Sequence, residues 1–116
     1  MVRKVTTEET AVITLNGSGN GTAKLGPLSA REAPWYVTSA SVKANNSPTN
    51  EAVCQLFAGP DSTQSNFRDA TYSGSSGDAS DKVAGKLQMN NYVFAVWSGG
   101  DANVQATLTV VVEKEL

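Results

Sequence analysis

The stretch before the C-terminus limits the fold most strongly, because apolar and polar residues alternate there from Val104 to Glu113. A period of two gathers residues on one face only when the backbone is extended, so the pattern predicts a strand with one buried face. Val111 is an exception, since it stands on the polar side. The residues predicted to face the core are Val104, Ala106, Leu108, Val110 and Val112.

The segment just before it, Tyr92 to Trp97, is apolar on both faces and rich in β-branched and aromatic residues. This composition is typical of a central strand that is covered on both sides. Residues 98–101 (Ser-Gly-Gly-Asp) lie between the two segments and supply glycines for a tight or bulged loop. We therefore expect the two segments to form a β-hairpin.

Shorter alternating or apolar runs fill the remainder of the chain, with Gly, Asn and Pro turn signals roughly every 8–12 residues. The polar tract 60–81 is predicted to be mostly loop, held against the core by Phe67 and Tyr72. No segment of helix length has a period of about 3.6 residues. The further expected strands are 10–15, 22–27, 35–43, 52–58 and 82–89.

About seven or eight short strands without helices predict an all-β fold, an antiparallel β-sandwich or a jelly-roll-like fold. A small closed barrel is the next candidate. A chain of 116 residues can bury one core, which we assign to a single domain over residues 11–116. Residues 1–10 are charged and weakly patterned, so we expect an exposed arm or an edge strand.

The composition excludes several classes of function. The chain has no histidine and one cysteine, Cys54, so a Cys/His zinc site, an internal disulfide and a His-dependent catalytic triad cannot form. A net charge of −2, with the positive residues scattered singly, argues against nucleic acid as a partner. The carboxylates stand mainly in turns and near the termini. We therefore expect no enzymatic activity and no cofactor.

Three motifs could bind a ligand or could serve only the fold. Residues 78–81 (Asp-Ala-Ser-Asp), with Asp101, could hold a cation, but they match no calcium-loop spacing and favour a solvated loop. The glycines of residues 16–21 resemble a phosphate loop, yet no helix pattern follows, which favours a hairpin turn. The aromatic residues form either a sugar-stacking face or core and subunit contacts, and we favour the latter. They are Trp35, Tyr36, Tyr72 and Trp97.

The N-terminus lacks a signal-peptide pattern, and no apolar window approaches the roughly 20 residues of a membrane-spanning helix. These observations predict assembly in a reducing cytoplasm and no membrane partner.

The second half of the chain resembles small β-sandwich structural proteins of tailed phages that infect actinobacteria. The likeness covers about residues 52–112 and extends weakly upstream through 35–37 (Trp-Tyr-Val). Its most distinctive part is the Trp-Ser-Gly-Gly-Asp run, and the order of the segments adds weight. The segments that carry it are 59–61 (Gly-Pro-Asp), 69–74 (Asp-Ala-Thr-Tyr-Ser-Gly), 95–101 (Ala-Val-Trp-Ser-Gly-Gly-Asp) and 106–110 (Ala-Thr-Leu-Thr-Val).

This resemblance implies a virion structural protein, most simply a capsid decoration or minor capsid protein on the capsid exterior, assembled in the host cytoplasm. Its partners would be the major capsid protein and copies of itself around a local symmetry axis. The alternative is a tail-associated or receptor-binding module that recognises a host-surface sugar. Because chain ends can order by adding to a sheet edge, the candidate contacts lie mainly there. They are Val2, Arg3, Lys4, Val5, Trp35, Tyr36, Glu113 and Lys114.

Overall fold

The computed structural model describes residues 4–27, 34–45, 52–73, 78–88 and 90–115. These residues form nine strands and one short 3-10 helix, Gln64–Asn66, and they contain no α-helix. The strands are β1 (Lys4–Thr14), β2 (Gly21–Leu25), β3 (Trp35–Ala44), β4 (Ala52–Gly59), β5 (Phe67–Ser73), β6 (Asp78–Ser80), β7 (Gly85–Leu87), β8 (Tyr92–Ser98) and β9 (Gln105–Glu115).

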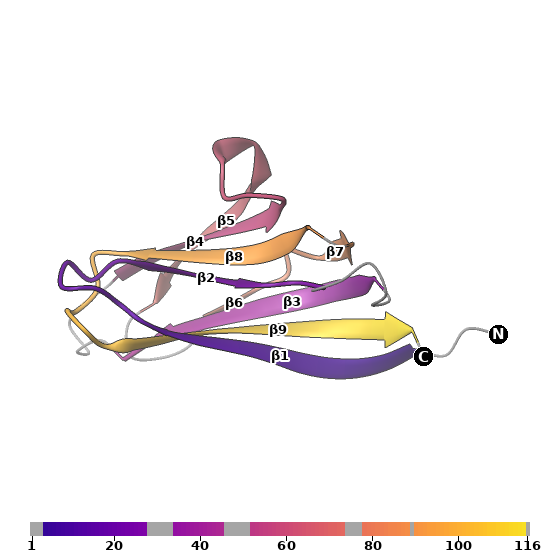
Figure 1. Ribbon diagram of the computed structural model, residues 1–116, viewed down its shortest axis with the longest axis horizontal. Helices are drawn as coiled ribbons and strands as arrows, with labels where there is room; N and C mark the ends of the chain where they lie inside the picture. Colours follow the sequence, from indigo (N-terminus) through magenta and orange to yellow (C-terminus); the bar gives the residue numbers. More distant parts are fainter. Residues whose placement is uncertain (1–3, 28–33, 46–51, 74–77, 89, 116) are drawn as a thin grey trace.

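The strands form two antiparallel sheets that face each other (Figure 1). One sheet has the order β1-β9-β3-β6, with β7 also pairing β3, and the other has the order β2-β8-β4-β5. The chain behaves as a long double strand folded back at the β4–β5 hairpin: β3 pairs with β6 and β7, β2 with β8, and β1 with β9. Successive pairs fall alternately in the two sheets, which is jelly-roll topology. The predicted all-β sandwich is confirmed.

The predicted hairpin over residues 92–113 is wrong. Strands β8 and β9 lie in different sheets, so residues 98–104 turn a corner of the sandwich instead of closing a ladder. The turn at residues 16–20, between β1 and β2, also crosses between the sheets and is no hairpin. Glycine and asparagine permit a sharp reversal of the backbone, but they do not determine whether the next strand returns to the same sheet.

These two corner turns are hydrogen-bonded to each other. Gly100 N donates to Gly19 O over 3.0 Å, and Asn103 N donates to Asn16 O over 3.2 Å. Gly19 has a φ of +75°, and a Cβ there would lie 1.9 Å from Gly100 O. Only glycine therefore allows the two backbones to approach this closely. We call this end of the sandwich the loop end.

The tract 60–81 contains more strand than its composition predicts. It includes β5 and β6, and the expected strand over 82–89 is reduced to β7. Strand β5 forms the edge of its sheet, where one side of the ladder is open and polar residues are tolerated. Short edge strands of this kind carry too few residues to show a clear period of two.

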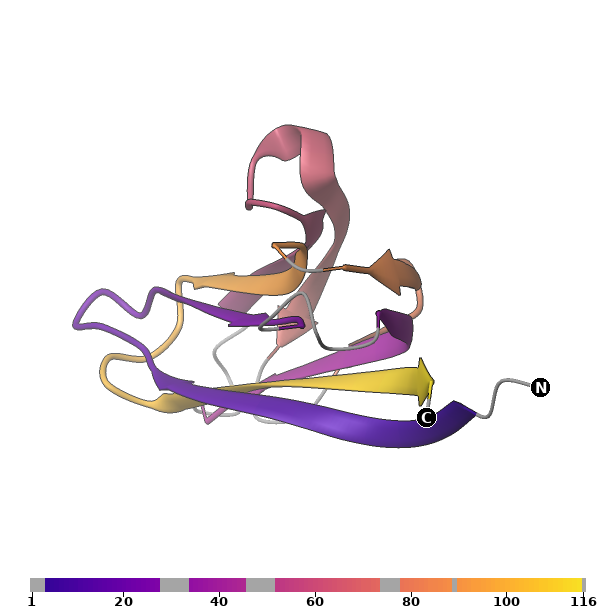
Figure 2. The ribbon, with the colours of Figure 1, turned by 45° about the vertical axis from the view of Figure 1, so that its right-hand side comes forward.

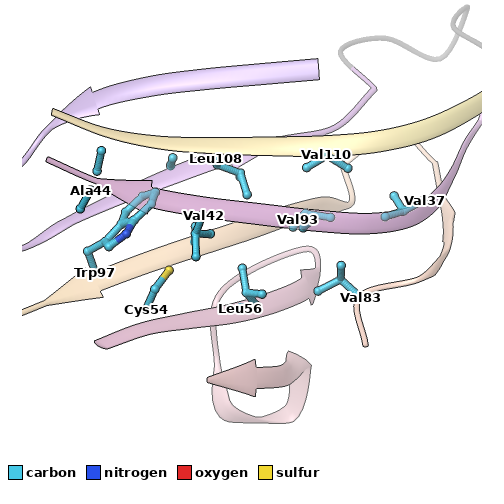
Figure 3. Packing of buried hydrophobic residues seen from close by; sticks show 14 of the residues in the cluster. Val37, Val42, Ala44, Cys54, Leu56, Val83, Val93, Trp97, Leu108 and Val110 are labelled. Carbon is cyan, nitrogen blue, oxygen red and sulfur yellow. The ribbon is translucent and has the colours of Figure 1, made fainter. Parts of the chain in front are cut away.

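The core lies between the sheets and confirms the alternation that the sequence shows near the C-terminus (Figure 3). Leu108 is fully buried, whereas Val111 on the opposite face is half-buried. Strand β3 alternates imperfectly because its pairing with β9 shifts between Val37 and Ser39. This bulge moves the inward positions from odd to even numbers, so that one strand keeps one buried face. Those positions are Trp35, Val37, Ala40, Val42 and Ala44.

Strand β1 begins at Lys4 and pairs with β9 along its whole length. Figure 2 shows it as a long strand at the edge of its sheet. Residues 4–10 are therefore part of the sandwich, and their removal would expose the edge of β9.

Candidate interaction surface at the terminal end

The end of the sandwich opposite the loop end holds the start of β1 and the end of β9 (Figure 1), and we call it the terminal end. Strand register places the described contact candidates side by side there. Val5 and Trp35 both stand opposite Lys114, and Tyr36 stands opposite Glu113. Lys4 stands one position further along β1. Val2 and Arg3 lie outside the described residues, and the contact role of the whole set stays a prediction.

The two neighbouring aromatic residues of this set lie on opposite faces of their sheet. Trp35 belongs to the buried core and is 4% exposed, whereas Tyr36 lies on the outer face and is half-buried. Tyr72 lies in β5 of the other sheet, and Trp97 is fully buried. The exposed sugar-stacking face that a carbohydrate module would need is therefore not formed by Trp35 and Tyr36, because alternate residues of a strand point in opposite directions.

Four lysines from four strands lie over aromatic rings at the terminal end. The Nζ atom of Lys4 is 4.4 Å from the centre of the Tyr36 ring, and that of Lys86 is 6.0 Å from it. These distances are typical of cation–π contacts. The other two pairs are Lys114 over Trp35 at 4.7 Å and Lys24 over Tyr92 at 4.6 Å.

These four lysines at one end of the molecule, two beside the outward-facing Tyr36 and two beside Trp35 and Tyr92, are a feature that sequence reasoning missed. They are spaced far apart in the chain, and the overall charge of −2 gives no sign of their clustering. Antiparallel pairing brings them together because β1, β2, β7 and β9 all have an end at the terminal end. Each lysine lies beside an aromatic residue of another strand, and this pairing could have been recognised only if the strand partners had been known.

A pocket of about 210 Å³ opens between the end of β2 and the middle of β1. Within it, Lys114 Nζ forms an ion pair of 2.7 Å with Glu9 Oε1, and the two side chains are 27% and 32% exposed. Three buried side-chain atoms of the described residues have no hydrogen-bond partner, and one of them, Trp35 Nε1, belongs to a residue of this pocket. The other two are Trp97 Nε1 and Thr7 Oγ1. The residues that line the pocket are Glu9, Lys24, Leu25, Gly26, Trp35, Tyr92 and Lys114.

A second pocket, of about 300 Å³, lies on the other side of the same end. It is more polar, and its cationic members are Arg68 and Lys86. The Arg68 guanidinium donates to Phe67 O at 3.1 Å and to Ala58 O at 3.2 Å, which fixes it against the β4–β5 hairpin. Part of its hydrogen-bonding capacity is thus used within the chain.

Asp61 and Asp69 each organise a local part of the described structure. Asp61 Oδ1 accepts hydrogen bonds from Thr63 Oγ1 at 2.7 Å and from Asn66 Nδ2 at 2.7 Å, and these bonds organise the β4–β5 turn. The Thr63 hydroxyl, the Thr63 amide and then Asn66 lower the pKa of Asp61 below its ordinary value. Asp69 Oδ2 accepts from the buried Ser80 Oγ at 2.6 Å, which ties β5 to β6 across the sheets.

The described residues contain no group of three or more His, Cys, Asp or Glu side chains placed to hold a metal ion. Within the same residues, no helix is long and apolar enough to cross a membrane.

Neither a protein-family model nor a curated protein sequence matches the chain. Two solved structures are similar to it over its whole length. One is a chain in the acid-stable capsid structure of Helicobacter pylori bacteriophage KHP30, with a TM-score of 0.57, 20% identity, and 100% of this chain and 94% of that chain covered. The other belongs to the disulfide-linked pili of Bacillus endospore appendages, with a TM-score of 0.57, 11% identity, and 100% and 91% covered. At these identities the likeness establishes a shared fold.

Proposed function

We propose that the chain is a bacteriophage virion structural protein that binds the exterior of a shell of major capsid protein and stabilises it, as a decoration or minor capsid protein. The observation that carries the proposal is the whole-length likeness to a chain of a phage capsid structure, which leaves almost no part of either chain unmatched. A jelly roll suits a protein whose task is to present surfaces to neighbouring subunits.

The physical basis of such a role is mass action. A rigid block that bridges two shell subunits binds only the assembled state, so each bound copy shifts the equilibrium toward the intact shell. A stable contact of this kind buries about 1,200–2,000 Å² in total. Copies that meet around a local symmetry axis would share that contact area among several shell subunits.

A pilus subunit is the competing role that the second structural likeness raises. The pili of that structure are disulfide-linked. The one cysteine of this chain, Cys54, is fully buried in β4 and points into the core (Figure 3). A disulfide between subunits would require the core to open, so the capsid role is favoured.

The proposal is tested by electron cryomicroscopy of the phage particles that carry this chain, together with particles from which its gene is deleted. We expect density for the sandwich at regular positions on the outside of the shell, absent from the deletion particles. Those particles should release their DNA at a lower temperature, and purified protein should restore the native value. Density on the tail alone, or particles of unchanged heat resistance and unchanged shell density, would refute the role.

A further inference from the structure

We propose that the pocket between the end of β2 and the middle of β1 receives a carboxylate side chain from an acidic segment of a partner protein. The inference rests on the proposed function for the identity of that partner as a shell subunit. The chemistry of the pocket itself can be measured on the isolated protein, so the two proposals can fail separately.

Charge is the first argument. The pocket holds two ammonium groups, Lys24 and Lys114, and one carboxylate, Glu9, which leaves one net positive charge (two minus one). A single carboxylate from outside would make the pocket neutral. Lys24 is exposed, and the Lys114–Glu9 pair remains partly exposed, so these groups can be reached by an incoming side chain.

The position of Trp35 is the second argument. Its ring lines the pocket and lies 4.7 Å from Lys114 Nζ, so a group that pairs with this lysine also comes close to the indole. The Nε1 atom of Trp35 is buried without an acceptor, but Trp97 Nε1 and Thr7 Oγ1, which do not line the pocket, are in the same state. The carboxylate is therefore assigned to the lysines, with which it forms charge-assisted hydrogen bonds.

The size and lining of the pocket give the third argument. Pockets that enclose a drug-sized ligand measure about 300–1,000 Å³. At about 210 Å³ this one is smaller, which suits one side chain of a peptide better than a nucleotide or a sugar ring. Leu25, Tyr92 and the Trp35 ring provide apolar walls for the methylene groups of a glutamate.

Nucleic acid is the other polyanion that a lysine cluster could attract. Glu9 and Glu113 lie among the lysines, and the chain as a whole is acidic, so a phosphate backbone would meet repulsion along most of its path. An isolated carboxylate in the pocket avoids this repulsion, and the observations therefore favour an acidic protein segment.

The chain offers a built-in control for the test, because it contains two tryptophans. Trp35 lies at the terminal end, and Trp97, fully buried, stands opposite Gly21 near the loop end. In a ¹⁵N-labelled sample the two indole N–H signals are resolved by NMR and assigned with Trp35→Phe. An acetylated and amidated hexaglutamate peptide should shift the Trp35 signal in a saturable manner and leave the Trp97 signal in place.

Lysine variants identify the binding groups. Lys24→Gln and Lys114→Gln should each weaken hexaglutamate binding roughly five-fold or more, because each removes one of the two attracting charges. Lys43→Gln is the matched control, since it changes the net charge equally but lies near the loop end opposite Thr107, and it should leave the affinity unchanged. Added salt should weaken binding by the native protein.

Four results would overturn the pocket assignment. They are no saturable shift of the Trp35 signal, equal effects of Lys43→Gln and Lys114→Gln, tighter binding of an oligothymidylate than of hexaglutamate, and a shift with a hexaglutamine peptide, which would show that charge is not recognised. Specific hexaglutamate binding by a protein that is absent from the shell would preserve the pocket and refute the decoration role.

Discussion

The two ends of the sandwich are held together in different ways. At the loop end the backbones of two corner turns bond to each other, and Gly19 approaches Gly100 so closely that no side chain fits between them. At the terminal end, strand ends are linked through side chains, with lysines over aromatic rings and an ion pair at the rim of a pocket. Backbone contacts fix geometry, whereas side-chain contacts can be exchanged for contacts with a partner.

Stability and binding should therefore depend on different ends of the molecule. Substitutions at the loop end should weaken the fold and leave any binding surface intact in the molecules that remain folded. Substitutions at the terminal end should alter binding while changing stability little, because partly exposed ion pairs and cation–π contacts each contribute about 1 kcal/mol or less.

The largest effect is expected from Gly19→Ala. The new Cβ would lie 1.9 Å from Gly100 O at a residue whose φ is +75°, so the two turns must separate. We expect a loss of about 3–4 kcal/mol in the free energy of unfolding, measured by urea titration. Gly17→Ala is the matched control, since a Cβ there meets nothing within 4 Å. Equal stability of the two variants would show that the turns do not brace each other.

A smaller loss is expected from Asn16→Ala in the same turn. Asn16 Oδ1 accepts from Ser18 N at 2.9 Å and from Asn20 N at 3.0 Å, and alanine leaves both amides to water. We expect a cost of about 1 kcal/mol in the same titration. Asn16→Asp keeps an acceptor at this position and should cost less than half as much. If it costs as much as Asn16→Ala, the two hydrogen bonds are not the cause of the lost stability.

The fold class could be predicted from the sequence because alternation is a local property. The alternation from Ala106 to Val112 does bury one face of β9, whereas Val104 precedes the strand and is half-buried. The run from Tyr92 does form a strand inside its sheet, but its second face is covered only in part, with Tyr92 and Val96 half-buried. The connection between them could not be predicted, since a glycine-rich turn serves equally within a sheet and between sheets. Sheet membership depends on which distant strand each segment pairs with, and no single segment carries that information.

The candidate surface could be predicted in part, and for a physical reason. The sequence named contact candidates at the chain ends and at Trp35 and Tyr36 without placing them relative to one another, and the strand register brings the described ones side by side. The clustering of Lys24 and Lys86 with the chain ends depends on tertiary pairing, so the scattered positive residues gave no warning of it. The orphaned indole of Trp35 is likewise visible only when every neighbour is in place.

A third substitution, Lys114→Met, tests whether the side-chain contacts of the terminal end contribute little to stability. Methionine keeps the packing of the aliphatic stem but removes the ion pair with Glu9 and the contact with the Trp35 ring. We expect a loss of no more than about 1 kcal/mol in a urea titration, because both partners of the ion pair are partly exposed. Lys86→Met, whose Nζ atom is 6.0 Å from its ring, should cost less still. A loss above about 2 kcal/mol would make this end structural, like the loop end.

The smallest expected effect is a difference in how the stability of two turns depends on pH. One side-chain oxygen organises a turn at each end, but Asn16 Oδ1 is neutral and Asp61 Oδ1 belongs to an ionisable group. Hydrogen bonds from Thr63 hold the pKa of Asp61 below 3.8, so its charged form is favoured in the folded state. That contribution is present above pH 3.8 and is lost as the pH falls through the folded pKa.

Asp61→Asn should therefore lower the melting temperature slightly at pH 7, and the difference from the native protein should shrink toward zero in strongly acidic solution. Asn16→Ala has no ionisable partner in its turn, so its deficit should stay constant across the same range. The two variants are compared by calorimetry at several pH values between 2 and 7. A deficit for Asp61→Asn that does not change with pH would mean that the turn depends on the shape of the side chain and not on its charge.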